Sequence, residues 1–341
     1  MYITMLNITA CFGVVMLHTN GIFWSHPKGV TWITSNFIET FMYWPVPIFF
    51  MISGATLFEY RKRYSTKVFM KKRLLKTLIP FIFWSIIAFY YHCSVNLYSG
   101  RFVESWIPNI GCLINYKYMY IYWFFVPLFA IYLSMPILNL LNGKWKLIRY
   151  LILYTFISYS IFPFLSETLH HAIDKQYYSP ISSGYILYVL LGYYLNSVSL
   201  NKKTRYIIYA LGVAGWALHF FGTLVLTPDF GGRETINMAF KGYMNFPCVF
   251  HSVAVFVLFK QCNFSILTRN KFVLQLINKM HASTLGIYLV HIYLLGIIVG
   301  LLHIDESSLT WRILGSLLIF VLAFVFVQCL KRIPIIRNVV P

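Results

Sequence analysis

Long apolar runs separated by short polar segments extend along nearly the whole chain. A helix that crosses a bilayer needs about 20 mostly apolar residues, so these runs predict membrane spans. Because their apolarity is continuous, they favour helices over barrel strands, which alternate over about 10 residues. Ten candidate spans follow, at residues 2–24, 36–58, 77–98, 118–141, 147–165, 183–198, 205–226, 243–260, 283–302 and 310–330. The pattern predicts an all-α integral membrane protein.

The composition supports a membrane protein and argues against a soluble one. Apolar residues make up 59% of the 341 residues and charged residues only 11%, whereas soluble domains carry about 25% charged residues. A net charge of +19 could indicate nucleic-acid binding, but the basic residues lie in short clusters between apolar runs. That arrangement is typical of membrane loops, so we expect the lipid bilayer as partner and no nucleic acid.

The distribution of basic residues predicts the orientation. With the amino terminus inside, twenty-one of the twenty-eight Lys and Arg residues lie on the cytoplasmic side. They are in the segments 59–76, 142–149, 199–205, 260–282 and 331–341. This is a strong positive-inside bias, and it predicts that both termini are cytoplasmic. We expect one transmembrane domain over residues 1–341, with no appended soluble domain and no cleavable signal peptide.

The six cysteines show no paired spacing such as C-x-x-C. Most of them lie in or beside apolar runs, where a free cysteine behaves as a small hydrophobic residue. The sequence therefore predicts neither a metal site nor a disulfide framework.

Ionisable residues inside the predicted spans are costly, which makes each one a functional candidate. They are His18, Glu39, His92, His219, His251 and His291. We interpret His92, His219 and His251 as structural. His18 differs because Thr19 and Asn20 follow it directly, and such a polar cluster favours a cavity over lipid. A neutral imidazole there suits general-base chemistry on a hydroxyl.

A second unusual segment covers residues 44–58. Pro45 and Pro47 come early in the predicted helix, and Ser53 and Gly54 come later. Proline frees backbone carbonyls in a membrane helix, and glycine permits close helix approach. A kinked packing helix also explains this segment.

Four sequence stretches together resemble the acyltransferase-3 family of membrane O-acyltransferases. They are "LNITACFGVVMLH" ending at His18, "VPIFFMISGATLF" ending at Phe58, "YWFFVPLFAIYLSMPILN" at 122–139, and "STLGIYLVH" ending at His291. Their order and spacing are similar to those of the enterobacterial-common-antigen O-acetyltransferase branch, which consists of the membrane domain alone.

The resemblance implies a multi-pass protein of the bacterial cell (inner) membrane that acetylates glycans. The donor would be acetyl-CoA on the cytoplasmic side, with no permanently bound cofactor, and the acceptor a hydroxyl on a glycan or lipid-linked glycan. His18 matches the family's catalytic histidine. The family's Arg-x-x-Arg element falls on Arg73 and Lys76, which with Lys72 would contact the CoA phosphates. Lysine supplies the charge without the bidentate fork of arginine.

One departure from the family pattern concerns the first span. The family's arginine, eleven residues before the histidine, falls on Asn7. At 1.5 Å per residue, Asn7 would lie about 16 Å from His18 toward the cytoplasm, where it would face the donor. Asparagine forms hydrogen bonds but cannot neutralise a phosphate. Another cation substitutes, the donor binds differently, or acyl transfer has been lost.

Four residues complete the predicted substrate pocket. Ser53 would donate to the developing oxyanion or pack a helix, and Glu39 would orient the imidazole of His18. His291 is either a pocket partner or a buried structural histidine, and Asn20 lies beside His18. The alternative function is a polysaccharide or lipid-linked glycan exporter of the same superfamily. The sequence leaves the oligomeric state open, including a homo-oligomer.

Overall fold

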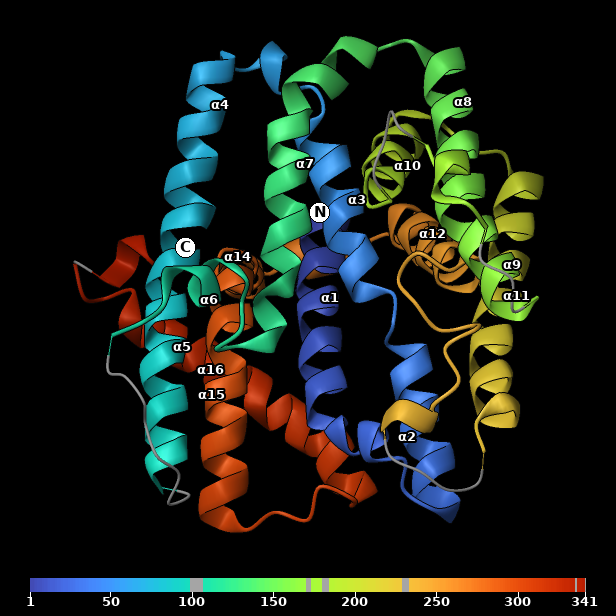
Figure 1. The fold of residues 1–341 in the computed structure, drawn as a ribbon. Helices are drawn as coiled ribbons and strands as arrows, with labels where there is room; N and C mark the ends of the chain where they lie inside the picture. Colours follow the sequence, from blue (N-terminus) through green and yellow to red (C-terminus); the bar gives the residue numbers. More distant parts are fainter. Residues whose placement is uncertain (99–106, 170–172, 180–183, 229–232, 335, 341) are drawn as a thin grey trace. The chain divides into compact units, whose positions relative to one another are not determined.

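The computed structural model describes residues 1–98, 107–169, 173–179, 184–228, 233–334 and 336–340, and its regular elements there are all helical (Figure 1). The predicted all-α fold is confirmed over these residues. Eight helical segments are long and apolar enough to cross a membrane. They are Tyr2–Thr19, Gly29–Lys62, Thr66–Asn96, Tyr120–Leu141, Trp145–Thr168, Lys202–Leu226, Thr284–Leu302 and Trp311–Leu330.

Two further apolar helices match the remaining predicted spans but are shorter. Ile186–Ser197 has 12 residues and Phe246–Gln261 has 16, below the length that a perpendicular crossing needs. The first residue of the predicted span 183–198 lies outside the described residues. Ten crossings and cytoplasmic termini therefore stay predictions.

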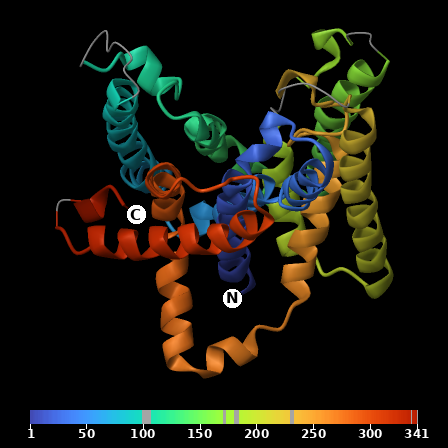
Figure 2. The same ribbon diagram turned by 90° about the horizontal axis from the view of Figure 1, so that it is seen from below.

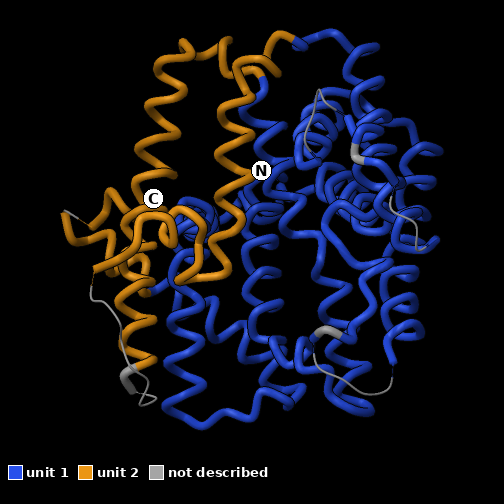
Figure 3. The backbone as a smooth tube through the Cα atoms, in the orientation of Figure 1, with its two compact units in different colours: residues 1–58, 141–325 blue, residues 59–140, 326–341 orange. Residues whose placement is uncertain are grey.

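The chain divides into two compact units, which Figure 3 shows in different colours. Unit 1 consists of residues 1–58 and 141–325, and unit 2 of residues 59–140 and 326–341. Unit 1 contains the predicted residues from the first, second and ninth spans. Unit 2 contains the basic residues predicted to bind the donor. The predicted pocket residues and the predicted donor-binding residues are therefore described separately, each within its own unit.

Helix α1 (Tyr2–Thr19) packs most extensively against four α-helices of unit 1 (Figures 1 and 2). They are α3 (Pro45–Leu57), α12 (Phe246–Gln261), α14 (Lys271–His281) and α15 (Thr284–Leu302). A helix that is apolar on all sides is suited to such a position, and α1 is apolar around its circumference. Its neighbours come from both ends of the sequence, which places the motif of α1 beside the motif of α15.

The other helices of unit 1 surround these elements. They are α2 (Gly29–Phe41), α8 (Trp145–Phe156), α9 (Phe162–Thr168), α10 (Ile186–Ser197), α11 (Lys202–Leu226), α13 (Ser265–Arg269) and the first part of α16 (Ser316–Leu330). A π-helical turn at Trp311–Gly315 leads into α16.

Unit 2 is formed mainly by α4 (Thr66–Arg73), α5 (Ile79–Tyr98), α6 (Ile110–Ile114) and α7 (Phe125–Leu138). The Ser65 hydroxyl caps α4 by accepting a bond from the Val68 N–H at 3.4 Å. A π-helical turn at Leu74–Leu78 connects α4 to α5. The predicted basic loop 59–76 is therefore largely helical from Thr66 onward.

The predicted span 36–58 contains a break. Helix α2 ends at Phe41, and α3 begins at Pro45, with no helix between them. Proline lacks a backbone N–H and restricts the residue before it, so Pro45 is suited to start a helix and not to continue one. The segment is two helices with a short connection, where a single kinked helix was predicted.

Helices α3 and α10 approach each other closely at two glycines. A Cβ atom on Gly54 would lie 2.0 Å from the Val189 carbonyl oxygen, and one on Gly192 would lie 2.0 Å from the Met51 carbonyl oxygen. Backbone atoms cannot move aside as flexible side chains do. The predicted role of Gly54 in close helix approach is confirmed.

Gly54→Ala should therefore destabilise the protein by about 1–3 kcal/mol, as overpacking of a core does. The measurement is the thermal unfolding midpoint of purified protein in detergent. Gly300→Ala is the matched control, because a Cβ there meets no atom within 4 Å and alanine favours helix. Equal midpoints for Gly54→Ala and native protein would contradict the close contact.

Candidate active site

Two histidines from opposite ends of the sequence lie together in unit 1. His18 is in the last turn of α1, and His291 is in α15. Their ring centroids are 5.1 Å apart with an interplanar angle of 40°. His18 is half-buried and His291 is fully buried. The structure thus brings together two of the residues that the sequence analysis singled out.

The hydrogen bonds of His291 assign its tautomer. Nδ1 lies 2.8 Å from the Tyr288 carbonyl oxygen and 3.1 Å from that of Ile287. Because a carbonyl oxygen only accepts, Nδ1 carries the hydrogen. In neutral His291 the lone pair is then on Nε2, which is buried and has no partner among the described residues. His291 therefore presents a hydrogen-bond acceptor in the neighbourhood of His18.

Asn20 caps the carboxyl end of α1 and connects two other elements. Its Nδ2 donates to the Ser35 carbonyl oxygen at 2.9 Å, and its Oδ1 accepts from Arg312 Nη1 at 3.5 Å. Both functional groups of this fully buried side chain are engaged in tertiary contacts. These contacts are those of a residue that connects helices. The predicted place of Asn20 in the substrate pocket stays a prediction.

Arg312 is a residue that the sequence analysis missed as a candidate. It was not among the ionisable residues singled out in the predicted spans, yet its side chain is 1% exposed and lies in the π-helical turn Trp311–Gly315. The available signal was its position inside the apolar run 310–330, since an arginine in a span is a functional candidate by default.

Ser53 donates its hydroxyl hydrogen to the Phe49 carbonyl oxygen of its own helix at 3.0 Å. The Ser53 hydroxyl hydrogen that an oxyanion would require is therefore already donated to Phe49. The contact is the one expected of a packing residue, which was the other role considered for Ser53.

Glu39 forms a buried ion pair with Lys241. Glu39 Oε1 accepts from Lys241 Nζ at 2.7 Å, and the two side chains are 3% and 0% exposed. The ammonium lies 4.0 Å from the ring centroid of Tyr43 and 4.8 Å from that of Phe23. Burial lowers the pKa of Lys241, and Glu39 acts in the opposite direction. Lys241 is the partner that the structure shows for Glu39, so orientation of His18 by Glu39 stays a prediction.

Asn7 lies against α14 and α15. Its Nδ2 is 2.9 Å from His281 Nδ1 and donates to Thr284 Oγ1 at 3.1 Å. Burial and then the positive amino terminus lower the pKa of His281. His281 is therefore mainly neutral at neutral pH and accepts the bond from Asn7. It does not replace the positive charge of the family arginine.

This environment predicts a pH effect on stability. The pKa of His281 is lower in the folded protein than in the unfolded chain, where it has the ordinary histidine value of about 6.5. As the pH falls below that value, the unfolded chain therefore binds a proton at His281 more readily than the folded protein does. Stability from this residue is present above that pH and is lost as the pH falls. We expect the unfolding midpoint to decrease less between pH 7 and pH 5 in His281→Gln than in native protein. His303→Gln, which alters an exposed histidine, should leave the slope unchanged, and equal slopes for all three proteins would contradict the assignment.

Arg73, Lys72 and Lys76 lie in unit 2 at the junction of α4 and the π-helical turn. The Arg73 guanidinium is 5.4 Å from the ring centroid of Tyr132, and its Nε is buried without a partner among the described residues. Lys72 and Lys76 are exposed. The π-helical turn Leu74–Leu78, which follows Arg73 and contains Lys76, is of a kind that recurs at functional sites. The donor role of these residues is untested.

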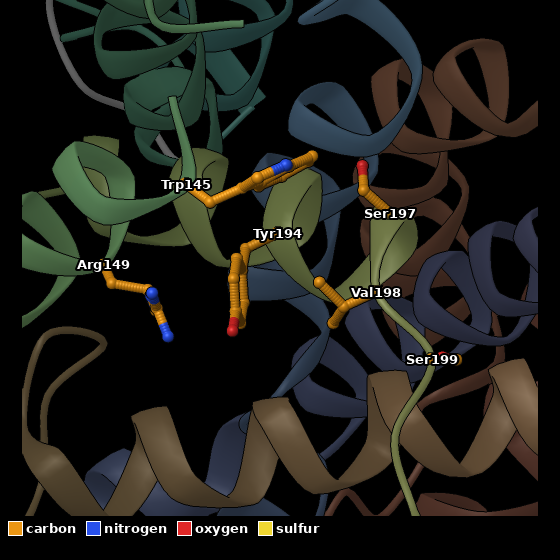
Figure 4. A pocket seen from close by; sticks show the side chains of 6 residues that line it. All are labelled: Trp145, Arg149, Tyr194, Ser197, Val198 and Ser199. Carbon is orange, nitrogen blue, oxygen red and sulfur yellow. The ribbon is translucent and has the colours of Figure 1, made fainter. Parts of the chain in front are cut away.

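A separate pocket of about 420 Å³ lies in unit 1 (Figure 4). Side chains from α8, from the end of α10 and from the segment that follows it line this pocket. They are Trp145, Arg149, Tyr194, Ser197, Val198 and Ser199. None of the predicted site residues lines it, so this pocket is not part of the candidate active site.

The long apolar helices indicate a multi-pass membrane protein, in which the rings of His18 and His291 lie side by side. The chain matches the family model described as an acyltransferase domain over residues 2–328. It therefore belongs to the acyltransferase-3 family and is a membrane acyltransferase. No curated protein and no solved structure matches the chain. The narrower likeness to the enterobacterial-common-antigen branch stays a prediction.

Proposed function

We propose that this protein is an O-acetyltransferase that moves an acetyl group from acetyl-CoA to a hydroxyl of a cell-surface or exported polysaccharide. The observation that carries the proposal is the contact between His18 and His291, with ring centroids 5.1 Å apart, in a chain of an acyltransferase family. The membrane would be the bacterial inner membrane, with acetyl-CoA bound from the cytoplasm. The positive-inside distribution of basic residues supports this orientation.

The two histidines fit the proton movements of this reaction. The acceptor oxygen attacks the thioester carbonyl carbon, and the carbon–sulfur bond breaks. His18 takes the hydroxyl proton as a general base and returns it to the leaving thiolate, so protons balance. His291 Nε2 accepts a hydrogen bond from the hydroxyl or from protonated His18. A route in which His18 first carries the acetyl group uses the same residues.

The donor phosphates would bind to the basic residues of unit 2. The Arg73 guanidinium lies 5.4 Å from the ring centroid of Tyr132, whereas Lys72 and Lys76 supply exposed charge. Arginine suits bidentate contact with phosphate. Because neither Asn7 nor neutral His281 supplies the charge of the family's arginine, these residues would contribute much of the charge that CoA requires.

Arg73→Gln should raise the KM for acetyl-CoA about 10- to 100-fold with little change in kcat, because hydrogen bonds to charged groups contribute about 1.5–3 kcal/mol. The measurement is label transfer from radioactive acetyl-CoA in membranes. Arg337→Gln is the control, since Arg337 is an exposed arginine of the same unit. A fall in kcat with unchanged KM would contradict donor binding by Arg73.

The function is tested with membrane vesicles of both orientations from cells that express the protein. Labelled acetyl-CoA should acetylate polysaccharide when it reaches the cytoplasmic face, in inside-out vesicles, and not in sealed right-side-out vesicles. Vesicles from cells without the protein set the background. Transfer from the outer face alone, or transfer equal to background, would contradict the proposal.

A further inference from the structure

The largest fully buried side chain in the described part of the protein is that of Arg312. A buried charge is costly unless it is paired and hydrogen-bonded. The two ion pairs found among the described residues are Lys62–Glu59 and Lys241–Glu39, and neither includes Arg312. Such a cation is retained only where its geometry serves a purpose.

The guanidinium instead contacts neutral oxygens on three separate elements. Nη2 donates to Thr34 Oγ1 of α2 at 2.9 Å and to the Ser307 carbonyl oxygen at 3.2 Å. Nη1 makes the long contact to Asn20 Oδ1 at 3.5 Å. Asn20 in turn donates to Ser35 of α2. Arg312 therefore connects the end of α1, helix α2 and the segment before α16.

Two of these contacts are themselves held in place. The Asp305 carboxylate accepts from the Ser307 hydroxyl at 2.7 Å and from the Ser307 N–H at 2.9 Å, which fixes the loop carrying the Ser307 carbonyl. Thr34 donates its own hydroxyl hydrogen to the Val30 carbonyl oxygen at 2.8 Å. Its oxygen is thus oriented to accept from Arg312. The arginine has a built, specific set of acceptors.

The positive charge of Arg312 lies near the carboxyl end of α1. Asn20 is the C-cap of α1, and the carboxyl end of a helix carries partial negative charge that a nearby cation stabilises. His18 lies in that same last turn. Any shift of the end of α1 moves the His18 imidazole relative to His291.

We propose that Arg312 is a positioning residue, which fixes the carboxyl end of α1 through Asn20 and thereby holds His18 against His291. This inference rests on the proposed function for its catalytic meaning. The placement of His18 itself is measurable without any acyl transfer.

The test compares the rates at which single histidines react with diethyl pyrocarbonate in purified full-length protein, followed by mass spectrometry. Arg312→Met keeps an unbranched apolar stem and removes the guanidinium donors. It should change the reaction rate of His18 at least about threefold. His303 is exposed and His219 is 2% exposed, so constant rates at both would exclude global unfolding. Ser316→Val is the matched control, because among the described residues the Ser316 hydroxyl bonds only to the Ile313 carbonyl oxygen of the adjoining π-helical turn.

One milder variant keeps the proposal testable where Arg312→Met fails to fold. Thr34→Val removes one acceptor and should shift the His18 rate in the same direction by a smaller factor. Where Arg312→Met folds, adding Asn20→Ala to it should give no larger change in the His18 rate than the stronger of the two single variants, because both substitutions remove the same contact. In membranes, Arg312→Met should lower kcat about tenfold or more with unchanged KM for acetyl-CoA, since small misplacements of reacting groups are costly.

An unchanged His18 rate in Arg312→Met and Thr34→Val would overturn the positioning role. A parallel rise at His219 would also overturn it, because Arg312 would then only stabilise the fold. An altered His18 rate in a protein without acyl transfer would instead support the positioning and contradict the proposed function.

Discussion

His18→Ala should lower acetyl transfer at least about 100-fold at equal membrane abundance, because general acid–base catalysis contributes about 10²- to 10⁴-fold. The variant removes the proton acceptor and leaves α1 packed, since most of the contacts of α1 come from its apolar residues. The measurement is the rate of label transfer from acetyl-CoA in membranes, normalised to protein abundance.

Two other histidines make this prediction specific. His291→Gln should have a smaller effect of about tenfold, because glutamine retains hydrogen-bonding groups without the fixed imidazole lone pair. His303→Ala, which changes an exposed histidine, should leave the rate unchanged. A rate for His18→Ala within a factor of about three of native protein would remove His18 from the mechanism.

Breaking the buried pair of Glu39 and Lys241 should cause the largest loss of stability. Glu39→Gln leaves the Lys241 ammonium buried without its carboxylate partner. Lys241→Met leaves the Glu39 carboxylate buried without its ammonium partner. Removing one partner of a buried pair costs about 3–5 kcal/mol, whereas replacing both is often neutral or stabilising. The double variant should therefore restore much of the unfolding midpoint that either single variant loses.

The exposed pair of Lys62 and Glu59 is the control for this cycle. Its side chains are 63% and 39% exposed, and exposed pairs contribute about 0–1 kcal/mol. Glu59→Gln should thus barely change the midpoint. A double variant of the buried pair as unstable as the sum of its single variants would show that the charges are not coupled.

The apolar runs were sufficient to predict the helical fold, because membrane helices need long continuous apolarity. The apolar runs were less accurate in predicting the residues at which a helix begins and ends. The first predicted span ended at residue 24, but Asn20 caps α1, and the chain continues as a short 3-10 helix at Gly21–Ser25. Hydrophobicity alone does not detect a cap, whereas Pro45 was a readable signal for the break between α2 and α3.

The candidate site was only partly accessible from the sequence. His18 and His291 were singled out by their motifs, and the structure brings them together. The partners of Glu39 and Asn7 were not predictable, because Lys241 and His281 are distant in sequence and carry no motif. Arg312 was not singled out, because a count of charges does not distinguish an arginine at the surface from one packed between helices.

The amount of acetate on the polysaccharide tests most directly whether this protein acetylates it. Acetate released by mild base would be measured in cells with native protein, with Asn7→Arg, and without the protein. We predict acetate with native protein, none without it, and no requirement for an arginine at position 7. Equal acetate in all three cells, with polysaccharide export lost when the protein is absent, would contradict this account and favour an exporter. Acetate that appears only with Asn7→Arg would contradict it as well, and would identify an enzyme that has lost its activity.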